Sequence, residues 1–312
     1  MKIFLLGSSG FIGNNLTDFL AKETNYSLTC FGTKSNNLLL YRNVDWIKNR
    51  LPSKIFEKKI KEYKPNFVLF CCGTSSVTDS VIEPSKDFKG SVILLEYVLE
   101  TIRKFSLDSK LLFFSSAAVY GSPKFYEKLS EESPKNPISP YGFNRLFCEN
   151  LLAQYRSLYS LQSVSLRIFS AYGDELQTRI FWDFAESIRK DNKIKVKCPP
   201  NVTRDFIHIT DLCKAVKLII DNYKFDGLSH SINIASGEST SIKKVTSIFK
   251  NNPFYDEDLE IEFSKNFRKG DPINWEADIS KLEKLSFKTS VSIEEGLSSY
   301  ISWYKKRFIN QL

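Results

Sequence analysis

Short apolar runs alternate with longer amphipathic segments along the first half of the chain. The apolar runs resemble buried strands and are Lys2–Leu6, Ser27–Phe31, Val44–Trp46, Phe67–Cys71, Leu111–Phe114 and Val164–Ile168. Helical periodicity follows four of them, over Ile12–Glu23, Ser53–Tyr63, Pro84–Phe105 and Tyr141–Tyr159. Short strands separated by amphipathic helices are typical of α/β proteins, so this half predicts a doubly wound parallel sheet.

The alternation of apolar runs and amphipathic segments becomes less regular after about residue 169. Loops rich in Pro, Asn and Ser, near 198–202, 251–258 and 268–274, separate predicted helices at 178–190, 210–223, 241–250 and 292–308. We therefore predict a first domain over residues 1–169 and a smaller, mixed α/β substrate domain over 170–312. Part of 203–235 is expected to pack back against the sheet. Ligands of such sheets bind beyond the carboxyl ends of the strands, which is where the second domain is expected to lie.

A glycine motif follows the first predicted strand and opens the first predicted helix. Gly7, Gly10 and Gly13 are spaced G-x-x-G-x-x-G. Glycines let the backbone approach a pyrophosphate, and the unpaired N–H groups of a helix N-terminus favour its negative charge. The motif in this context predicts a dinucleotide-binding domain of the Rossmann type. The other residues expected to contact the cofactor near this edge are Ser9, Phe11, Ile12, Trp46, Cys71 and Gly73.

The end of the second predicted strand bears on the choice of cofactor. A carboxylate there binds the ribose 2′-hydroxyl of NAD, but Thr33 and Lys34 occupy this stretch and no acid appears before Asp45. A hydroxyl and a lysine suit a 2′-phosphate, so the sequence favours NADP and leaves NAD as the alternative. Asp45 is a candidate partner for the adenine amino group.

The amino-acid composition limits the kinds of molecule that we expect this protein to bind. Of 312 residues, 44 are Lys or Arg and 36 are Asp or Glu, a formal charge of +8, yet no basic tract reaches five residues. We therefore expect no nucleic-acid partner. The 6 cysteines form no C-x-x-C pair, which favours reduced thiols and no metal site. The apolar run at the N-terminus is too short for a signal peptide and no stretch approaches ~18 apolar residues, so we expect a cytoplasmic protein without a membrane partner.

A second group of motifs extends over nearly the whole chain. Ser115 to Gly121 reads S-S-A-A-V-Y-G after the fifth predicted strand, and Tyr141 to Arg145 reads Y-G-F-N-R at the start of a long helix. Leu166–Gly173, Arg204–Asp211 and Arg268–Asp271 follow in that order. With the glycine motif they resemble the extended short-chain dehydrogenases/reductases, in particular the nucleotide-sugar epimerase/dehydratase group.

The resemblance implies that Ser116, Tyr141 and Arg145 are catalytic, and that Tyr141 and Arg145 also contact the cofactor. Hydride transfer at a carbinol requires an acid/base near neutral pH, and lowering a tyrosine pKa from about 10 to about 7 requires roughly 4 kcal/mol. A neighbouring cation supplies this, and the family uses lysine where this chain has Arg145. Arginine keeps the charge but is bulkier and forked, so the site either tolerates it or has lost activity.

On the substrate side the resemblance implies a nucleoside-diphosphate sugar. Arg204 and Arg268 would contact the diphosphate, Asp271 the nucleotide ribose, and Ser116 and Ser170 the sugar. Two positions depart from the family, because Asp87 and Ser170 stand where asparagine is common. The family also implies a homodimer formed through the helices at 84–105 and 141–159.

The reaction is narrowed by Ala117 and Ala118, which stand where sugar 4,6-dehydratases carry Asp-Glu. What remains is hydride transfer at one carbon, most often C4. The missing carboxylate after the second strand favours a 4-keto-sugar reductase in the synthesis of deoxysugar or cell-surface polysaccharide precursors. The alternatives are a 4-epimerase similar to UDP-glucose 4-epimerase, with retained NAD, and a catalytically weak NADP-binding sensor.

Overall fold

The computed structural model describes residues 1–34, 41–123, 127–225, 230–255, 258–266, 270 and 272–309. The six predicted strands all form, as β1 (Lys2–Leu6), β2 (Ser27–Gly32), β3 (Val44–Lys48), β4 (Phe67–Phe70), β5 (Lys110–Ser116) and β6 (Ser163–Ile168). A further strand, β10 (Ser231–Ile234), pairs with β6. Together they make a seven-stranded parallel sheet in the order β10-β6-β5-β4-β1-β2-β3, which confirms the α/β, Rossmann-type fold.

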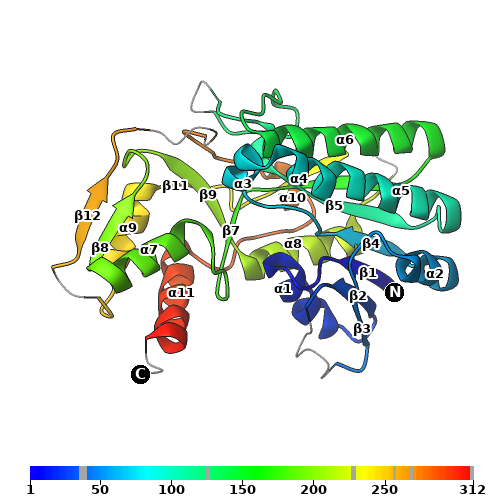
Figure 1. Ribbon diagram of the computed structural model, residues 1–312, viewed down its shortest axis with the longest axis horizontal. Coiled ribbons are helices and arrows are strands. Elements are labelled where there is room, and N and C mark those ends of the chain that lie inside the picture. The colour runs from blue at the N-terminus through cyan, green and yellow to red at the C-terminus, as the bar shows by residue number, and fades with distance from the viewer. Residues whose placement is uncertain are drawn as a thin grey trace.

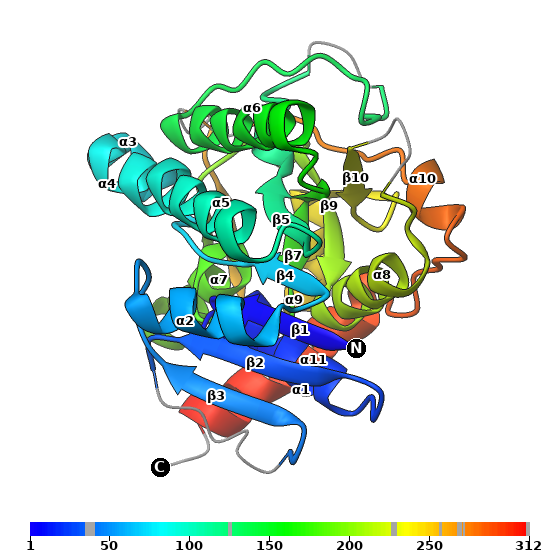
Figure 2. The ribbon, with the colours of Figure 1, turned by 90° about the vertical axis from the view of Figure 1, so that its right-hand side faces the viewer.

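Helices cover both faces of this sheet because its strands are apolar on both sides (Figure 1, Figure 2). In β1, Ile3 and Leu5 pack in one core with α1 (Phe11–Ala21) and α8 (Ile209–Asn222). The alternate residues, Phe4 and Leu6, pack in another with α2 (Lys54–Tyr63), α5 (Leu94–Phe105) and α6 (Pro140–Tyr159). The sheet order reverses beside β1, which has β2 on one side and β4 on the other. Such a reversal is where ligands of open α/β sheets bind.

The long helix predicted over Pro84–Phe105 is interrupted. It consists of α4 (Pro84–Phe88), a π-helical turn η1 (Lys89–Ile93) and α5, and a short helix α3 (Val77–Ile82) precedes it. The wide turn lies close to the loop after β4, since a Cβ added at Gly73 would be 3.0 Å from the carbonyl oxygen of Gly90. Periodicity alone does not reveal such a turn, because the apolar residues of α5 continue the pattern of α4.

The C-terminal region lies at one end of the large sheet (Figure 1). Its strands are β7 (Ser170–Tyr172), β9 (Thr203–His208) and β11 (Ser239–Ser241) in one sheet, and β8 (Lys193–Val196) and β12 (Glu260–Phe263) in another. Its helices are α7 (Arg179–Asp191), α9 (Ile242–Lys250), α10 (Ser280–Glu283) and α11 (Ile293–Phe308). A separate core rich in aromatic residues, including Phe181, Phe206, Phe249 and Tyr300, holds α7, α9 and α11 on these strands.

Within the part of the chain that the structure describes, none of the helices combines the length and the apolar character needed to cross a membrane.

Candidate active site

The glycine loop lies between β1 and α1 at the carboxyl edge of the sheet. Gly7 has φ +89°, and a Cβ there would lie 2.7 Å from the carbonyl oxygen of Cys71. A Cβ on Gly13 would lie 2.3 Å from the carbonyl oxygen of Gly7. Both positions therefore require glycine, because any side chain would push the loop away from β4 or the helix away from the loop.

The middle glycine is under no such constraint and faces outward. Gly10 is exposed, caps α1, and would tolerate the packing of a Cβ, whose nearest contact is 3.4 Å away. Phe11 and Ile12 begin α1, whose first turn carries no acidic residue. The N–H groups at this helix end thus face outward with an uncompensated positive potential, which fits a pyrophosphate.

The end of β2 lies against the same loop. The Thr33 N–H donates to Ser9 Oγ at 3.1 Å, and the two hydroxyl oxygens are 3.3 Å apart. Trp46 Nε1 donates to the carbonyl oxygen of Lys34 at 3.3 Å. This places Ser9, Thr33, Lys34 and Trp46 along one edge, where a nucleotide ribose would follow the pyrophosphate.

Asp45 lies farther from this edge. It pairs in register with Thr29, whereas Lys48 pairs with Gly32 at the carboxyl end, so Asp45 is three residues, about 10 Å, short of that end. Its carboxylate forms an ion pair with Lys59 Nζ at 3.0 Å. The contact between Asp45 and adenine stays a prediction. In the structure, the partner of this carboxylate is Lys59.

Asn49 is a residue at this edge that the sequence analysis missed. Its backbone N–H donates to the carbonyl oxygen of Gly32 at 2.9 Å. Its side-chain Oδ1 is buried and has no hydrogen-bond partner among the described residues. An acceptor in this state suits an amino group of a bound base, but nothing in the sequence pattern around Asn49 signals it.

The predicted catalytic serine and tyrosine come together. Ser116 is the last residue of β5, and its Oγ accepts the N–H of Ala118 at 3.2 Å at the start of the short helix η2 (Ala117–Val119). Tyr141 is the second residue of α6, and its N–H donates to Ser80 Oγ at 3.1 Å. Tyr141 is 8% exposed, and the Ser116 side chain acts on its phenol to lower the pKa.

The phenol of Tyr141 is poised for proton transfer. Burial by itself would raise its pKa, but the positive charges of Arg145 and Arg179 and the hydrogen bond with Ser116 outweigh burial. The net result is a pKa below the ordinary value of tyrosine. Other buried tyrosines of the chain behave in the opposite way, since burial raises the pKa of Tyr304 to about 12. A tyrosine that is buried and yet more acidic than usual marks a functional site.

Arg145 occupies the position of the family's lysine and lies beside the phenol. Its Cζ is 4.9 Å from the centre of the Tyr141 ring, and the residue is 4% exposed. Nη1 donates to the carbonyl oxygen of Phe114 at 3.4 Å and Nη2 to that of Thr74, whereas the buried Nε has no partner among the described residues. Gly73 is next to it, since a Cβ there would lie 3.5 Å from Nη2. The arginine therefore keeps a cation next to the tyrosine.

A buried carboxylate faces this cation. Asp87 is 1% exposed and accepts hydrogen bonds from Thr74 Oγ1 and from Asn144 Nδ2. Burial alone would lower the pKa of Arg145, but its pKa is raised, mainly by Tyr141 and to a smaller extent by the negative charge of Asp87. Two departures from the family pattern, Asp87 and Arg145, thus lie in one buried network.

The predicted substrate residues approach from the C-terminal region. Ser116 pairs in register with Ile168, so Ser170 begins β7 just beyond the same edge. Arg204 lies over Trp275, with its Cζ 5.6 Å from the ring centre, and Trp275 Nε1 donates to the carbonyl oxygen of Gly121 at 2.9 Å. A small cavity of about 20 Å³ lies there, lined by Val77, Ala118, Gly121, Ile138, Ser139, Gly270, Pro272 and Trp275. Arg268 and Asp271 fall outside the described residues.

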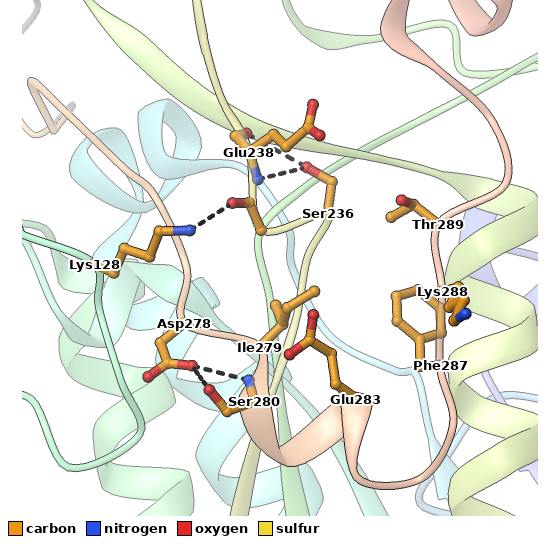
Figure 3. Close-up of a pocket in the computed structure, with 11 residues that line it drawn as sticks. Lys128, Ser236, Glu238, Asp278, Ile279, Ser280, Glu283, Phe287, Lys288 and Thr289 are labelled. Atoms are coloured by element: carbon orange, nitrogen blue, oxygen red, sulfur yellow. Dashed lines mark hydrogen bonds between the residues drawn. The ribbon is translucent and has the colours of Figure 1, made fainter.

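A larger cavity of about 730 Å³ lies elsewhere (Figure 3). Its lining runs from Lys128 and the 236–238 turn to α10 and residues 287–289, and includes none of the catalytic candidates. Many of its polar groups already bind one another: Lys128 Nζ donates to the carbonyl oxygen of Gly237, and Ser280 donates to Asp278. We therefore assign the candidate active site to the surroundings of Tyr141 and not to this cavity.

Known proteins resemble this chain over nearly its full length. A putative UDP-glucose 4-epimerase of Methanocaldococcus jannaschii is 27% identical over 315 residues, covering 97% of this chain and 98% of the relative. In fold, the chain is similar to a variant of UDP-glucuronic acid 4-epimerase from Bacillus cereus, in complex with UDP-4-deoxy-4-fluoro-glucuronic acid and NAD. The TM-score is 0.90 at 23% identity, with 99% of this chain and 100% of that one covered.

A second solved structure agrees in fold. It is a UDP-N-acetylglucosamine 4-epimerase from Methanobrevibacter ruminantium in complex with UDP-N-acetylmuramic acid. Its TM-score is 0.86 at 25% identity, and the match covers 98% of this chain and 99% of that one. Residues 3–235, which include the glycine loop, Ser116, Tyr141 and Arg145, match the NAD dependent epimerase/dehydratase family. The chain is therefore an enzyme of the NAD dependent epimerase/dehydratase family.

Proposed function

We propose that this enzyme is a nucleotide-sugar 4-epimerase that works with bound NAD. The observation that carries the proposal is the Ser116–Tyr141 pair, a buried tyrosine with a lowered pKa at the carboxyl edge that also holds the glycine loop. The relatives named as 4-epimerases support this reaction, and a solved neighbour in complex with NAD supports this cofactor. The predicted 4-keto-sugar reductase and the predicted preference for NADP receive no support from the comparisons.

The residues of the glycine loop would hold the cofactor. Gly7, Gly10 and Gly13 provide a surface without side chains that the pyrophosphate can approach, with the first turn of α1 facing it. The adenosine would be bordered by Ser9, Thr33 and Trp46. The nicotinamide end of the cofactor would be bordered by Cys71, Gly73 and Arg145. NAD held by these residues would supply the acceptor and donor for the hydride of the sugar carbon.

Tyr141 would move the proton that accompanies the hydride. Its phenolate takes the proton of the sugar C4 hydroxyl, and the phenol returns the same proton to the oxygen after the sugar has turned its other face. Ser116 donates a hydrogen bond to that oxygen, and Arg145 stabilises the phenolate throughout. Because proton and hydride both return, an epimerase needs no external reductant.

The remaining predicted residues fit a diphosphate sugar held from the C-terminal region. Arg204 would bind phosphate oxygens through its planar guanidinium, and Ser170 would contact the sugar near Ser116. Roles for Arg268 at the diphosphate and Asp271 at the ribose stay predictions. Ala117 and Ala118 offer no acid or base for eliminating water, so dehydration is not expected.

Purified protein is the direct test of reaction and cofactor. We expect NAD to be released on denaturation and UDP-glucose or UDP-glucuronic acid to be converted to its C4 epimer without added NADPH. Chromatography of the nucleotide and of the sugar products measures both. An empty site, with consumption of NADPH on a 4-keto nucleotide sugar, would instead establish the reductase. Binding of NADP without turnover on a panel of nucleotide sugars would establish the sensor.

We also propose that the enzyme is a homodimer. Exposed apolar side chains gather on α6 and its neighbours: Phe143 is 47% exposed, Phe147 48% and Leu158 63%, with Ile93 on η1 49%. Phe143 and Phe147 lie one turn apart on one side of α6. Apolar side chains spread along such a helix indicate an interface with a second copy.

Phe147→Glu is expected to give a monomer in light scattering after size exclusion, because a buried carboxylate at the interface has no partner. Ile55→Glu on α2, where Ile55 is 47% exposed, is the matched control and should leave the dimer intact. A wild-type protein that is monomeric at micromolar concentration would contradict the homodimer.

A further inference from the structure

Two arginines from different parts of the chain hold the loop between β4 and α3. Arg145 Nη2 on α6 donates to the carbonyl oxygen of Thr74. Arg179 Nη2, at the start of α7, donates to the carbonyl oxygen of the next residue, Ser75, at 2.8 Å. The two guanidinium groups thus bind consecutive carbonyls of one loop, and both act on Tyr141.

The backbone of Arg179 has an unusual conformation. Its φ of +72° lies in the left-handed region, which costs a non-glycine residue roughly 1–3 kcal/mol. It follows the N-cap residue Thr178, whose side chain makes no capping hydrogen bond. Such a conformation persists only where other contacts hold it, and the contact that the structure shows is the bond to Ser75, 104 residues earlier in the chain.

The charge of Arg179 is not countered by a carboxylate. Within the described ranges no ion pair joins Arg179 to an acidic residue, whereas Arg145 has Asp87 close by. The other titratable groups near the site, Cys72 of the loop after β4 and Cys148 of α6, face Arg145. Arg179 therefore adds a second positive charge that acts on the phenol, from an exposed position and after that of the buried Arg145 in size of effect.

We propose that Arg179 is a second cationic partner of Tyr141, reaching from the C-terminal region to stabilise the phenolate while its bond to Ser75 holds that region against the catalytic loop. The proposal rests on the assignment of Tyr141 as the acid/base. It assigns Arg179 the role of a positioning residue that acts through the tyrosine, in addition to the adjacent cation on α6. The acid/base strength of the site then depends on the C-terminal region being in place.

Arg179→Gln tests this through the pH dependence of turnover. Loss of a positive charge disfavours the phenolate, so the acidic limb of the kcat profile is expected to move up by about 0.5–1 pH unit. Arg179→Lys should restore at least half of that shift. Arg189→Gln is the control, because Arg189 lies on the last turn of the same helix and pairs with Glu186 at 2.8 Å. It should leave the profile unchanged.

Phenolate absorbance gives a readout that does not need turnover. The chain has 14 tyrosines, so the signal of Tyr141 is isolated as the difference between each protein and the same protein carrying Tyr141→Phe. The isolated titration should move upward in Arg179→Gln by the same amount as the kinetic limb. An unchanged titration, or an equal shift in Arg189→Gln, would overturn the proposal. Failure to epimerise sugars with the titration shift present would contradict only the proposed function.

Discussion

Tyr141→Phe is expected to lower the rate of epimerisation by about 10²–10⁴-fold, equivalent to roughly 3–5.5 kcal/mol in the activation free energy. The substitution removes one oxygen from a residue that is 8% exposed and whose pKa is lowered by Arg145, Arg179 and Ser116. The surroundings of that oxygen lower its pKa from the ordinary value of tyrosine, in the direction of neutral pH. Without it, the sugar hydroxyl has no acceptor for its proton at the moment of hydride transfer.

Binding of NAD should be nearly unchanged in the same variant. The phenylalanine ring still packs under Arg145, whose Cζ is 4.9 Å from the ring centre, and the glycine loop lies on another element. Turnover and NAD affinity, the latter by quenching of protein fluorescence, separate the two effects. Tyr26→Phe is the matched control, because it also removes a buried phenol oxygen, one that donates to Asp221. Activity of Tyr141→Phe within tenfold of the wild type would remove the acid/base assignment.

The central strands of the large sheet, β1, β4 and β5, were predictable because burial on both faces makes them nearly continuous apolar runs. Lys2–Leu6 is β1 to the residue, and the other runs end within two residues of their strands. β10 was different, since Ser231–Ile234 has only two bulky apolar residues and gains its place through pairing with β6. Pairing between residues 66 positions apart, such as Ser165 and Ser231, is not encoded in local periodicity.

For the helices too, some features follow from residues close in sequence and others from distant segments of the fold. The N-termini of α2 and α11 are set by Ser53 and Ser292, which cap these helices and can be recognised in the sequence. The π-helical turn η1 in the middle of Pro84–Phe105 follows from packing beside Gly73 and was missed. The apolar spacing on both sides of this turn is compatible with one straight helix.

The site was predictable where short motifs define it. Short sequence motifs identify Gly7, Gly13, Ser116, Tyr141 and Arg145 as candidates, and the structure brings them to one edge of the sheet. Arg179 and Asn49 were missed because their partners, Ser75 and Gly32, are supplied by other segments of the fold. The predicted preference for NADP rests on a local feature, the stretch with Thr33 and Lys34 and no acid before Asp45, and the comparisons do not support it.

The edge of the sheet at the candidate site is supported by a buried ion pair between Glu149 and Arg167, of which only Arg167 lies in one of the sequence motifs. Glu149 on α6 accepts hydrogen bonds from Arg167 Nη2 at 2.8 Å and from Ser115 Oγ at 2.7 Å, and Ser115 precedes Ser116, the proposed catalytic serine. Arg167 on β6 also donates to the hydroxyl of Tyr120 at 2.9 Å. The pair and the Ser115 bond join α6, which carries Tyr141, to β5, which ends at Ser116, and to β6, which ends at Ile168. Its members are 9% and 2% exposed, so little water is available to replace a lost partner.

Glu149→Ala is therefore expected to destabilise the protein by about 3–5 kcal/mol, because it leaves the guanidinium of Arg167 buried without its counter-charge. For a chain of this size that corresponds to a fall of roughly 6–20 °C in Tm, measured by a thermal scan followed by circular dichroism. Glu294→Ala is the control: its ion pair with Lys244 is equally short, 2.8 Å, but both side chains are about half exposed. Loss of that pair should cost about 0–1 kcal/mol. Equal effects of the two substitutions would show that burial does not set the strength of the Glu149 pair, and that α6 is held to the sheet by its apolar contacts alone.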